Sequence, residues 1–233
     1  MQWDVCYEDN HILVVNKPGG MLVQGDKTGD TPLVEHLKAY IKEKYNKPGN
    51  VFLGVVHRLD RPTSGIVVFA RTSKALRRLN EQFAQRDVAK TYWALVPKGL
   101  KNNESRLEHW LVRNAQKNKS FAYDAQVADA KKAALSYKIR HRLDRYELLE
   151  IALETGRHHQ IRCQLAKIGF PVRGDLKYGA ARSNPDGNID LHARQLILEH
   201  PVKKERMTFT ASVPKTSLWL SVPSDCGAVP FLG

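Results

Sequence analysis

One polar loop between two apolar runs decides the fold, and it reads His57-Arg58-Leu59-Asp60-Arg61-Pro62-Thr63-Ser64-Gly65. The runs on either side, Val51 to Val56 and Ile66 to Ala70, are too short for helices and rich in β-branched residues. They therefore predict two buried strands. A loop that a rigid scaffold holds at the surface is a usual place for catalysis. The sequence thus predicts that the chemistry of the protein lies on this loop.

Towards the N-terminus and just beyond the loop, the chain predicts alternating strands and helices. Two short strands fit Trp3 to Lys17. Thr31 can cap a first helix with Pro32 at its first helical position. The apolar residues of that helix recur at helical spacing: Leu33, Val34, Leu37 and Ile41. Thr72 begins a second helix, and Ala89 to Val96 alternates as a strand.

The C-terminal half predicts mainly antiparallel strand pairs. Lys98 to Lys119 shows no sustained period, so we expect short strands and a mobile basic loop there. Leu135 to His141 and Tyr146 to Glu154 alternate as a hairpin. A helix begins at Thr155 and ends at Gly169. The last strands lie near Leu191 to Leu198 and Met207 to Val213. Strands that pair with sequence neighbours, with few helices, predict an α+β fold with a mixed, largely antiparallel sheet.

The composition is that of a folded, basic protein. The 233 residues include 37 Lys and Arg against 24 Asp and Glu, a formal net charge of +13, and 42% are hydrophobic. That apolar share supports a core and excludes a disordered or collagen-like chain. A strong positive charge favours a polyanionic partner such as RNA or DNA. Basic residues cluster in two segments, Arg71 to Arg78 and Lys131 to Arg145, which can follow a phosphate backbone.

Location and redox state follow from what the sequence lacks. No apolar stretch reaches the ~18 residues that span a bilayer, and the first residues lack the pattern of a signal peptide. We therefore expect a cytoplasmic protein with no membrane contact. The three scattered cysteines, Cys6, Cys163 and Cys226, predict reduced thiols without a disulfide framework or a zinc site.

Motifs for metal, nucleotide and serine-hydrolase chemistry are missing, which leaves Asp60 as the candidate reactive group. It lies between Arg58 and Arg61, and neighbouring guanidinium groups favour an ionised carboxylate. Such a carboxylate can act as a nucleophile or a base. From these residues alone, a salt-bridged turn aspartate is the favoured interpretation, and a reactive carboxylate is the alternative. We expect no metal and no cofactor.

Residues 57–70 closely resemble the catalytic motif of the RluA-type family of RNA pseudouridine synthases, His-Arg-Leu-Asp-x-x-Thr-Ser-Gly followed by an apolar strand. Four further segments are similar to family motifs in the family's order: residues 7–20, residues 90–96, residues 153–162 and residues 174–179. One difference is His158, where the family usually has threonine.

The resemblance implies a pseudouridine synthase fold, with flanking helices and loops around a central RNA-binding cleft. It implies one catalytic domain over residues 1–233, with no S4 domain, that isomerises specific uridines in structured ribosomal RNA or tRNA. We expect a monomer. The catalytic residues implied are Asp60, Tyr92 and Arg162, where Arg162 pairs with the aspartate and Tyr92 stacks on the uracil. The RNA-binding residues implied are Arg58, which fills the space that the flipped base leaves, and His57, Arg61, Thr63, Arg157 and His159.

Two alternatives from other classes remain open. The chain could be an RNA-binding module that has lost activity, although the set of Asp60, Tyr92 and Arg162 is intact. It could also hydrolyse a glycosidic bond, although glycosidases use two carboxylates and no second acid accompanies this loop.

The five-residue pattern of the loop occurs a second time, as His141-Arg142-Leu143-Asp144-Arg145. This copy lacks the Thr-Ser-Gly continuation and lies between the two alternating runs of the predicted hairpin. We therefore expect Asp144 to be a surface turn residue and Asp60 to be the essential aspartate.

Overall fold

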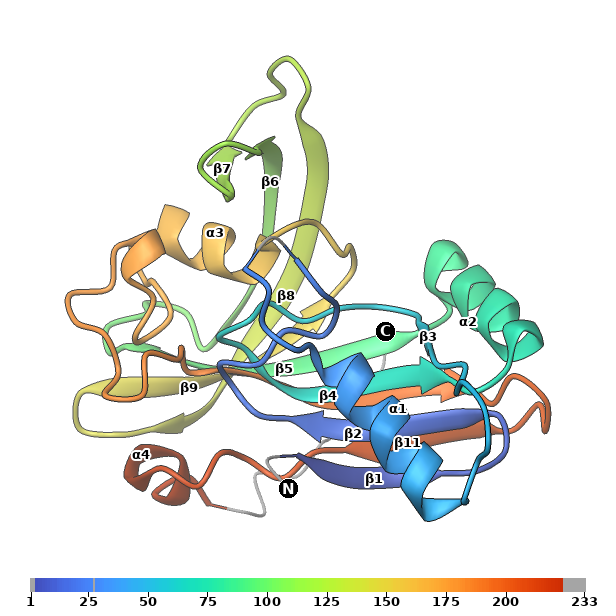
Figure 1. The fold of residues 1–233 in the computed structure, drawn as a ribbon. Coiled ribbons are helices and arrows are strands. Elements are labelled where there is room, and N and C mark those ends of the chain that lie inside the picture. Colours follow the sequence, from blue (N-terminus) through green and yellow to red (C-terminus); the bar gives the residue numbers. More distant parts are fainter. Residues whose placement is uncertain (1–2, 27, 224–233) are drawn as a thin grey trace. The chain divides into compact units, whose positions relative to one another are not determined.

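The structure is a computed structural model that describes residues 3–26 and 28–223 (Figure 1). The chain forms two compact units. Unit 1 comprises Met1–Ala89 and Ala193–Ser212, and unit 2 comprises Lys90–His192 and Val213–Gly233. The prediction of a single catalytic domain over residues 1–233 stays a prediction.

Unit 1 contains strands in the order β1-β2-β4-β10, in which β1 pairs antiparallel with β2 and β2 pairs antiparallel with β4. β11 pairs antiparallel with β10, and the short β3 pairs antiparallel with the end of β4. The bounds of its strands are β1 Asp4–Glu8, β2 Ile12–Lys17, β3 Gly54–Val55, β4 Ser64–Ala70, β10 Leu191–Glu199 and β11 Arg206–Thr210. β10 enters unit 1 at Ala193.

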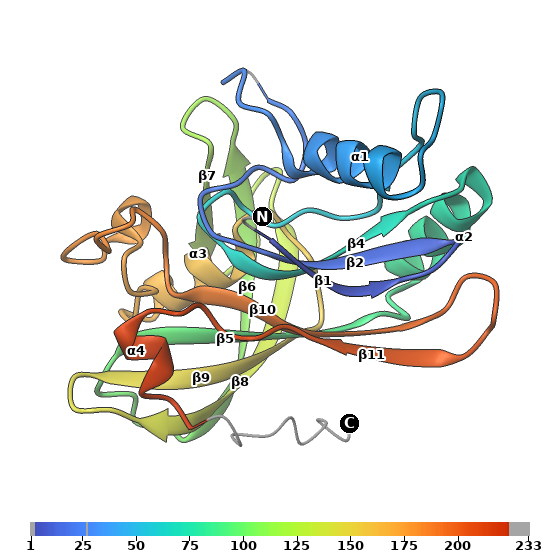
Figure 2. The ribbon, with the colours of Figure 1, turned by 60° about the horizontal axis from the view of Figure 1, so that its bottom comes forward.

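The central strands of unit 1 are apolar without alternation because both of their faces are covered. Ile12 of β2 and Val68 of β4 pack with Leu79 of the helix α2, Ser73–Gln85. Successive side chains of a strand point to opposite faces, so Leu13 and its alternating neighbours face the other way. On that side lies the helix α1, Leu33–Lys44 (Figure 2).

The two helices of unit 1 begin differently. At α2 the Thr72 hydroxyl accepts a hydrogen bond of 3.1 Å from the Ala75 N–H, as the sequence predicts. At α1 the prediction of Thr31 as the cap is wrong by one residue, because Pro32 is the N-cap and provides no side-chain hydrogen bond. The predicted apolar face of α1 is confirmed, since Leu33, Val34, Leu37 and Ile41 are buried.

Unit 2 is an antiparallel sheet in the order β5-β9-β8-β6-β7. Its strands are β5 Ala89–Pro97, β6 Glu104–Asn114, β7 Lys119–Tyr123, β8 Lys131–Arg142 and β9 Tyr146–Leu153. Its helices are α3 Gln160–Lys167, the 3-10 turn η1 Leu176–Tyr178 and α4 Ser217–Leu220. Leu165 of α3 packs with Ala94 and Ile151 of the sheet in the main core of the unit.

Three predicted elements differ from the structure. The segment expected to hold short strands and a mobile loop carries β6, a strand of 11 residues. Val51 to Val56 forms only the two-residue strand β3. The helix expected from Thr155 begins at Gln160, because His159 has a left-handed backbone with φ 51°. Its end at Gly169 is confirmed, since Ile168 is the C-cap and Gly169 follows with φ 86°.

The two described cysteines are free: Cys6 is exposed and Cys163 is buried. Burial raises the pKa of the Cys163 thiol to about 11, which keeps that thiol protonated at neutral pH. Cys226 lies outside the described residues. In residues 3–26 and 28–223, no helix is long and apolar enough to cross a membrane.

Candidate active site

The loop that carries Asp60 is fixed from both sides within unit 1. The Val68 N–H donates a hydrogen bond of 3.1 Å to His57 Nε2, and the His57 ring stacks on Phe83 with centroids 4.8 Å apart. After the aspartate, Arg61 Nε donates to the Gly20 carbonyl at 3.0 Å. His57 and Arg61 thus anchor the ends of the loop, and their expected contacts with RNA stay predictions.

Asp60 lies between these anchors on a tight turn. Its carbonyl accepts a hydrogen bond of 3.0 Å from the Thr63 N–H, and its side chain is half-buried. Arg58, two residues earlier, is exposed to solvent. Thr63 is 2% exposed, and its hydroxyl has no hydrogen-bond partner among the described residues. The turn therefore leaves Arg58 at the surface, Asp60 half-buried and Thr63 buried.

The turn can continue into β4 only because of Gly65. Gly65 has φ 116°, a backbone conformation that side chains rarely adopt. A Cβ atom at this position would overlap the Ala193 backbone of β10. The glycine of the Thr-Ser-Gly segment thus allows the first residues of β4 to approach the backbone of β10 closely within unit 1.

A buried lysine that the sequence analysis did not select lies beneath the loop. Lys17 ends β2 and is fully buried, and its Nζ donates to the carbonyls of Pro18 at 2.9 Å, Met21 at 2.9 Å and Arg61 at 3.2 Å. Burial lowers the pKa of Lys17 to about 7, the charge of Asp60 raises it, and that of Arg61 lowers it. The signal in the sequence is a lysine that ends an otherwise buried apolar strand just before Pro-Gly-Gly.

In unit 2, Arg162 is held by a bidentate ion pair on α3. Its Nε lies 2.6 Å from Asp175 Oδ2, and its second terminal nitrogen lies 2.8 Å from Oδ1. Both side chains are buried, and the guanidinium carbon lies 5.1 Å from the centroid of the Tyr178 ring. A two-point contact of this kind fixes the plane of the guanidinium group. The expected pairing of Arg162 with Asp60 stays a prediction.

His159 and His158 tie the start of α3 to neighbouring elements of unit 2. His159 Nδ1 hydrogen-bonds with the Tyr178 hydroxyl at 3.0 Å, and the two histidine rings stack with centroids 3.8 Å apart. His158 hydrogen-bonds with Ser120 Oγ at 3.0 Å and with Asn118 Oδ1 at 3.1 Å. The departure from the family threonine therefore adds contacts to β7 and to the turn before it.

The two remaining predicted residues of unit 2 lie on its strands and loops. Tyr92 is on β5 opposite Ile151 of β9, half-buried and partly packed against the main core. Arg157 precedes α3, and its Nε donates to the Lys132 carbonyl at 3.2 Å.

The predicted site residues therefore form two sets. His57, Arg58, Asp60, Arg61 and Thr63 share one loop of unit 1, whereas Tyr92, Arg157, His159 and Arg162 belong to unit 2. Asp175, Tyr178 and His158 support the second set. The sequence analysis did not assign them roles, and the signal for Asp175 was the segment of residues 174–179 that resembles a family motif.

Much of the charge in the two basic clusters is used inside the protein. Arg71 pairs with Glu8 at 3.0 Å, and Arg78 donates to the Pro201 carbonyl at 2.6 Å. In the second cluster three cations have acidic partners: Lys132 with Glu108, Arg140 with Glu150, and Arg142 with Glu147. Fewer cations than the sequence indicates are available for phosphates.

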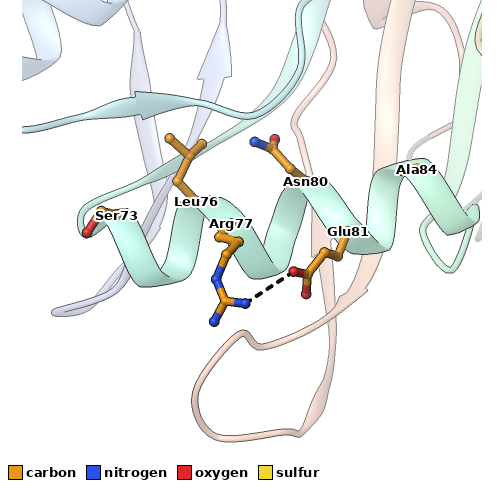
Figure 3. A pocket seen from close by; sticks show the side chains of 6 residues that line it. All are labelled: Ser73, Leu76, Arg77, Asn80, Glu81 and Ala84. Atoms are coloured by element: carbon orange, nitrogen blue, oxygen red, sulfur yellow. Dashed lines mark ion pairs between the residues drawn. The ribbon is translucent and has the colours of Figure 1, made fainter.

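A surface pocket of about 480 Å³ lies along α2, and none of the predicted site residues lines it (Figure 3). Arg77 and Glu81 form an ion pair of 3.5 Å on the exposed side of this helix. Among the described residues, no three His, Cys, Asp or Glu side chains are grouped as metal ligands would be.

Comparison with known proteins identifies the family. Residues 11–167 match the family model described as RNA pseudouridylate synthase. The chain is 34% identical to an uncharacterised RNA pseudouridine synthase of Bacillus subtilis, over 92% of the chain and 70% of that protein. It is 33% identical to the ribosomal large subunit pseudouridine synthase D of Pseudomonas aeruginosa, over 94% of the chain and 71% of that protein.

The fold agrees with solved structures. Human RNA pseudouridylate synthase domain containing 4 has a TM-score of 0.77 at 24% identity, covering 91% of this chain and 89% of that one. Human RNA pseudouridylate synthase domain containing 1 has a TM-score of 0.69 at 23% identity, with 91% and 84% covered. The α+β class with mostly antiparallel strands and the pseudouridine synthase fold are confirmed. Taken with the matched motifs, these similarities show that the chain belongs to the RluA-type family of RNA pseudouridine synthases, isomerases that act on uridines in RNA.

Proposed function

We propose that this enzyme isomerises uridine in ribosomal RNA and that Asp60 is its catalytic carboxylate. The observation that carries the proposal is the position of Asp60, on a turn that His57 and Arg61 anchor and under which the buried Lys17 lies. A side chain held in this way starts near its reactive geometry, which lowers the entropy cost of catalysis.

The names of the relatives support ribosomal RNA as the substrate in this proposal, rather than tRNA. Several relatives are named ribosomal large subunit pseudouridine synthase D, at 33% to 36% identity. The proposal carries with it a cytoplasmic location, where ribosomal RNA is processed, and a monomeric enzyme. Sedimentation of the purified chain tests the monomer.

The reaction needs no external reagent, because its atoms balance within the substrate. The bond from N1 of uracil to C1′ of ribose breaks, C5 bonds to C1′, C5 loses a proton, and N1 gains one. In the proposal the Asp60 carboxylate starts the reaction by attacking the base, attacking C1′ or removing the C2′ proton. Tyr92 stacks on the uracil and takes part in removing the C5 proton.

The remaining residues act on the position of the substrate. A uridine leaves its stack before it can reach Asp60, at a cost of a few kcal/mol. Arg58, which is exposed, occupies the space that the base leaves, since a guanidinium plane can stack on bases and bind a phosphate. In the proposal Arg162, whose plane Asp175 fixes, orients the aspartate.

Release of tritium from RNA labelled at C5 of uridine tests this function. The purified protein should release tritium from ribosomal RNA made without the modification and should leave pseudouridine at defined positions. Mapping pseudouridine in cells with and without the gene distinguishes ribosomal RNA from tRNA. Appearance of free uracil would instead support the hydrolase alternative, and no tritium release from either RNA would contradict the proposal.

A further inference from the structure

The part of the unit 2 sheet formed by β8, β6 and β7 has two different faces. Its inner face packs on α3, where Leu111, Ala122 and Ala133 contact Cys163 and Ala166. Because side chains alternate along a strand, the neighbours of these residues point to the opposite, outer face. β7 is the last strand in the order of this sheet.

The strand register gathers aromatic and basic side chains on the outer face. Tyr123 of β7 lies opposite Trp110 of β6, which lies opposite Lys132 of β8. In the next rows Phe121 lies opposite Val112, and Lys119 lies opposite Asn114. Directly opposite residues have Cβ atoms about 4.5–5.5 Å apart, so their side chains form one continuous surface. We call this surface the aromatic face: Trp110, Val112, Lys119, Phe121, Tyr123 and Lys132.

The rings of the aromatic face are accessible to a ligand. Phe121 is 37% exposed and Tyr123 is 40% exposed. Trp110 is half-buried, whereas the three other tryptophans are all buried: Trp3, Trp93 and Trp219. Exposed apolar side chains scattered singly need no explanation, but a contiguous group indicates a binding surface.

The hairpin of β6 and β7 that carries these rings is positively charged. From Arg113 to Tyr123 the chain has three cations, Arg113, Lys117 and Lys119, and no acidic residue. None of these cations has an ion-pair partner within residues 3–26 and 28–223. Lys119 Nζ lies at the edge of the sheet, 5.7 Å from the centroid of the Phe121 ring and 5.0 Å from that of Tyr178. A ring and an ammonium group thus lie side by side, which suits a partner that has both a flat base and a phosphate.

We infer that the aromatic face binds single-stranded RNA outside the uridine that is isomerised, by stacking bases on Phe121, Tyr123 and Trp110. Phe121 and Tyr123 are two residues apart on one strand, about 7 Å, so each can take one of two successive unstacked bases. Lys117 and Lys119 meet the phosphates, whereas Arg113, opposite the buried Ser120, belongs to the inner face. This inference rests on the proposed function only in that the substrate is RNA.

Single-stranded RNA fits this surface better than an RNA duplex does. A duplex hides its base faces and offers mainly phosphates and hydroxyls, for which exposed aromatic rings have no use. An exposed ring on a sheet beside a lysine is a stacking platform that tolerates any sequence, because every base has a π-face.

The double variant Phe121→Ala and Tyr123→Ala tests the aromatic face in the full-length protein. Its Kd for a labelled single-stranded oligouridine should rise about tenfold or more, since stacking on each ring is worth a large factor in affinity. The matched control is Phe52→Ala, because Phe52 is 49% exposed and lies in unit 1. The control should keep its Kd within about twofold, and thermal unfolding verifies that both variants fold.

Tryptophan fluorescence provides a second readout on the unaltered protein. Stacking of a base on Trp110 should quench the signal of the wild type as the oligonucleotide is added. In Trp110→Phe the quenching should disappear, because the remaining tryptophans are buried. This readout keeps the inference testable even if the double variant does not fold.

Three outcomes would overturn the inference. They are an unchanged Kd in the double variant, quenching that persists in Trp110→Phe, and a dimer of the wild type that the double variant loses, which would make the face an interface between copies. Failure of the proposed function is separate, because it would appear as a wild type that binds RNA and releases no tritium.

Discussion

The same five residues, His-Arg-Leu-Asp-Arg, occur at 57–61 and at 141–145, and the two copies adopt different structures. The first is a loop that leads into β4. The second begins on β8 and turns at once into β9, with the Leu143 N–H donating to the Tyr146 carbonyl at 2.8 Å. The prediction that Asp144 is an exposed turn residue is confirmed.

The side chains of the two copies have different partners. In the first copy Arg61 binds the Gly20 carbonyl and the exposed Asp30. In the second copy Arg142 pairs at 3.1 Å with Glu147, which is 2% exposed. The first copy thus organises a loop, and the second secures a buried carboxylate in a hairpin. A short motif therefore takes its role from the segments that meet it.

Substitution of the two aspartates should give the largest difference between the two copies, and the rate of tritium release measures it. Asp60→Asn removes the anion and nearly preserves the shape, so tritium release should fall below detection while RNA affinity is retained. Asp144→Asn should leave the rate within a few fold, because exposed turn substitutions usually change stability by about 0.5 kcal/mol or less. An active Asp60→Asn enzyme, or a folded Asp144→Asn enzyme without activity, would reverse the assignment of the two copies.

The next largest difference is expected in the free energy of unfolding when a lysine near each copy is replaced. Lys17→Met takes the ammonium donor from three carbonyls, of which Arg61 O keeps a hydrogen bond from the Gly20 N–H. We expect the free energy of unfolding to fall by about 2 to 4 kcal/mol, the cost of buried carbonyls without donors. Urea denaturation measures the change.

The matched control beside the second copy is Lys98→Met. Lys98 is exposed, and its N–H donates to the Arg145 carbonyl, a bond that the substitution keeps. Its free energy of unfolding should stay within about 0.5 kcal/mol of the wild type. Equal losses in the two variants would mean that the buried lysine is not what supports the first copy.

For the arginines, we expect the larger loss of stability at the second copy, whereas for the lysines we expect it at the first. Arg142→Gln leaves the buried Glu147 with the Leu100 N–H as a donor at 3.2 Å, so we expect a loss of about 1 to 3 kcal/mol. Arg61→Gln breaks an exposed ion pair with Asp30, which contributes about 1 kcal/mol or less. Chemical denaturation measures the stability of both variants. If Arg61→Gln were the less stable one, the second copy would not be the one whose arginine secures a buried carboxylate.

A separate expected effect is a dependence of stability on pH, which accumulates over the range between the folded and unfolded pKa values of Lys17. The pKa of Lys17 is about 7 in the folded protein and near 10.4 in the unfolded chain, so between these values the unfolded state binds more protons. This group therefore makes the protein more stable as pH rises from 7 to 10, by at most about 1.4 kcal/mol per pH unit. The difference between wild type and Lys17→Met, compared at pH 7 and pH 9.5, should grow with pH. A constant difference would show that Lys17 keeps its ordinary pKa.

Periodicity predicted the elements whose buried positions are apolar. β4 and α1 are of this kind, and their buried apolar residues were assigned correctly, although β4 begins two residues earlier than predicted, at Ser64. β6 was missed because one of its three buried residues, the one between Leu107 and Leu111, is polar. His109 is buried there and hydrogen-bonds with Gln164 at 3.0 Å, a partner 55 residues away that no local pattern reveals.

The start of α3 was missed for a similar reason. Gln160 Oε1 accepts hydrogen bonds from the Thr155 hydroxyl at 2.7 Å and from the Arg157 N–H at 3.0 Å, which hold the preceding residues in a turn. The sequence predicted that Thr155 begins the helix, but its hydroxyl donates to the Gln160 side chain instead of capping a helix at that point. Likewise the motifs identified Asp60 and Arg162, whereas Lys17 became a candidate only when its burial was known.

Unit 1 is made of two stretches of chain that residues 90–192 separate, and this affects its synthesis. Leu196 and Phe209 complete the core that Ile12 and Val68 begin. At about 5–20 residues per second, the ribosome exposes β2 and β4 for several seconds or longer before β10 and β11 leave it. During that interval the apolar strands have an open edge, which is a template for aggregation. Chaperone demand in the cell should therefore depend on how fast the intervening unit 2 is translated.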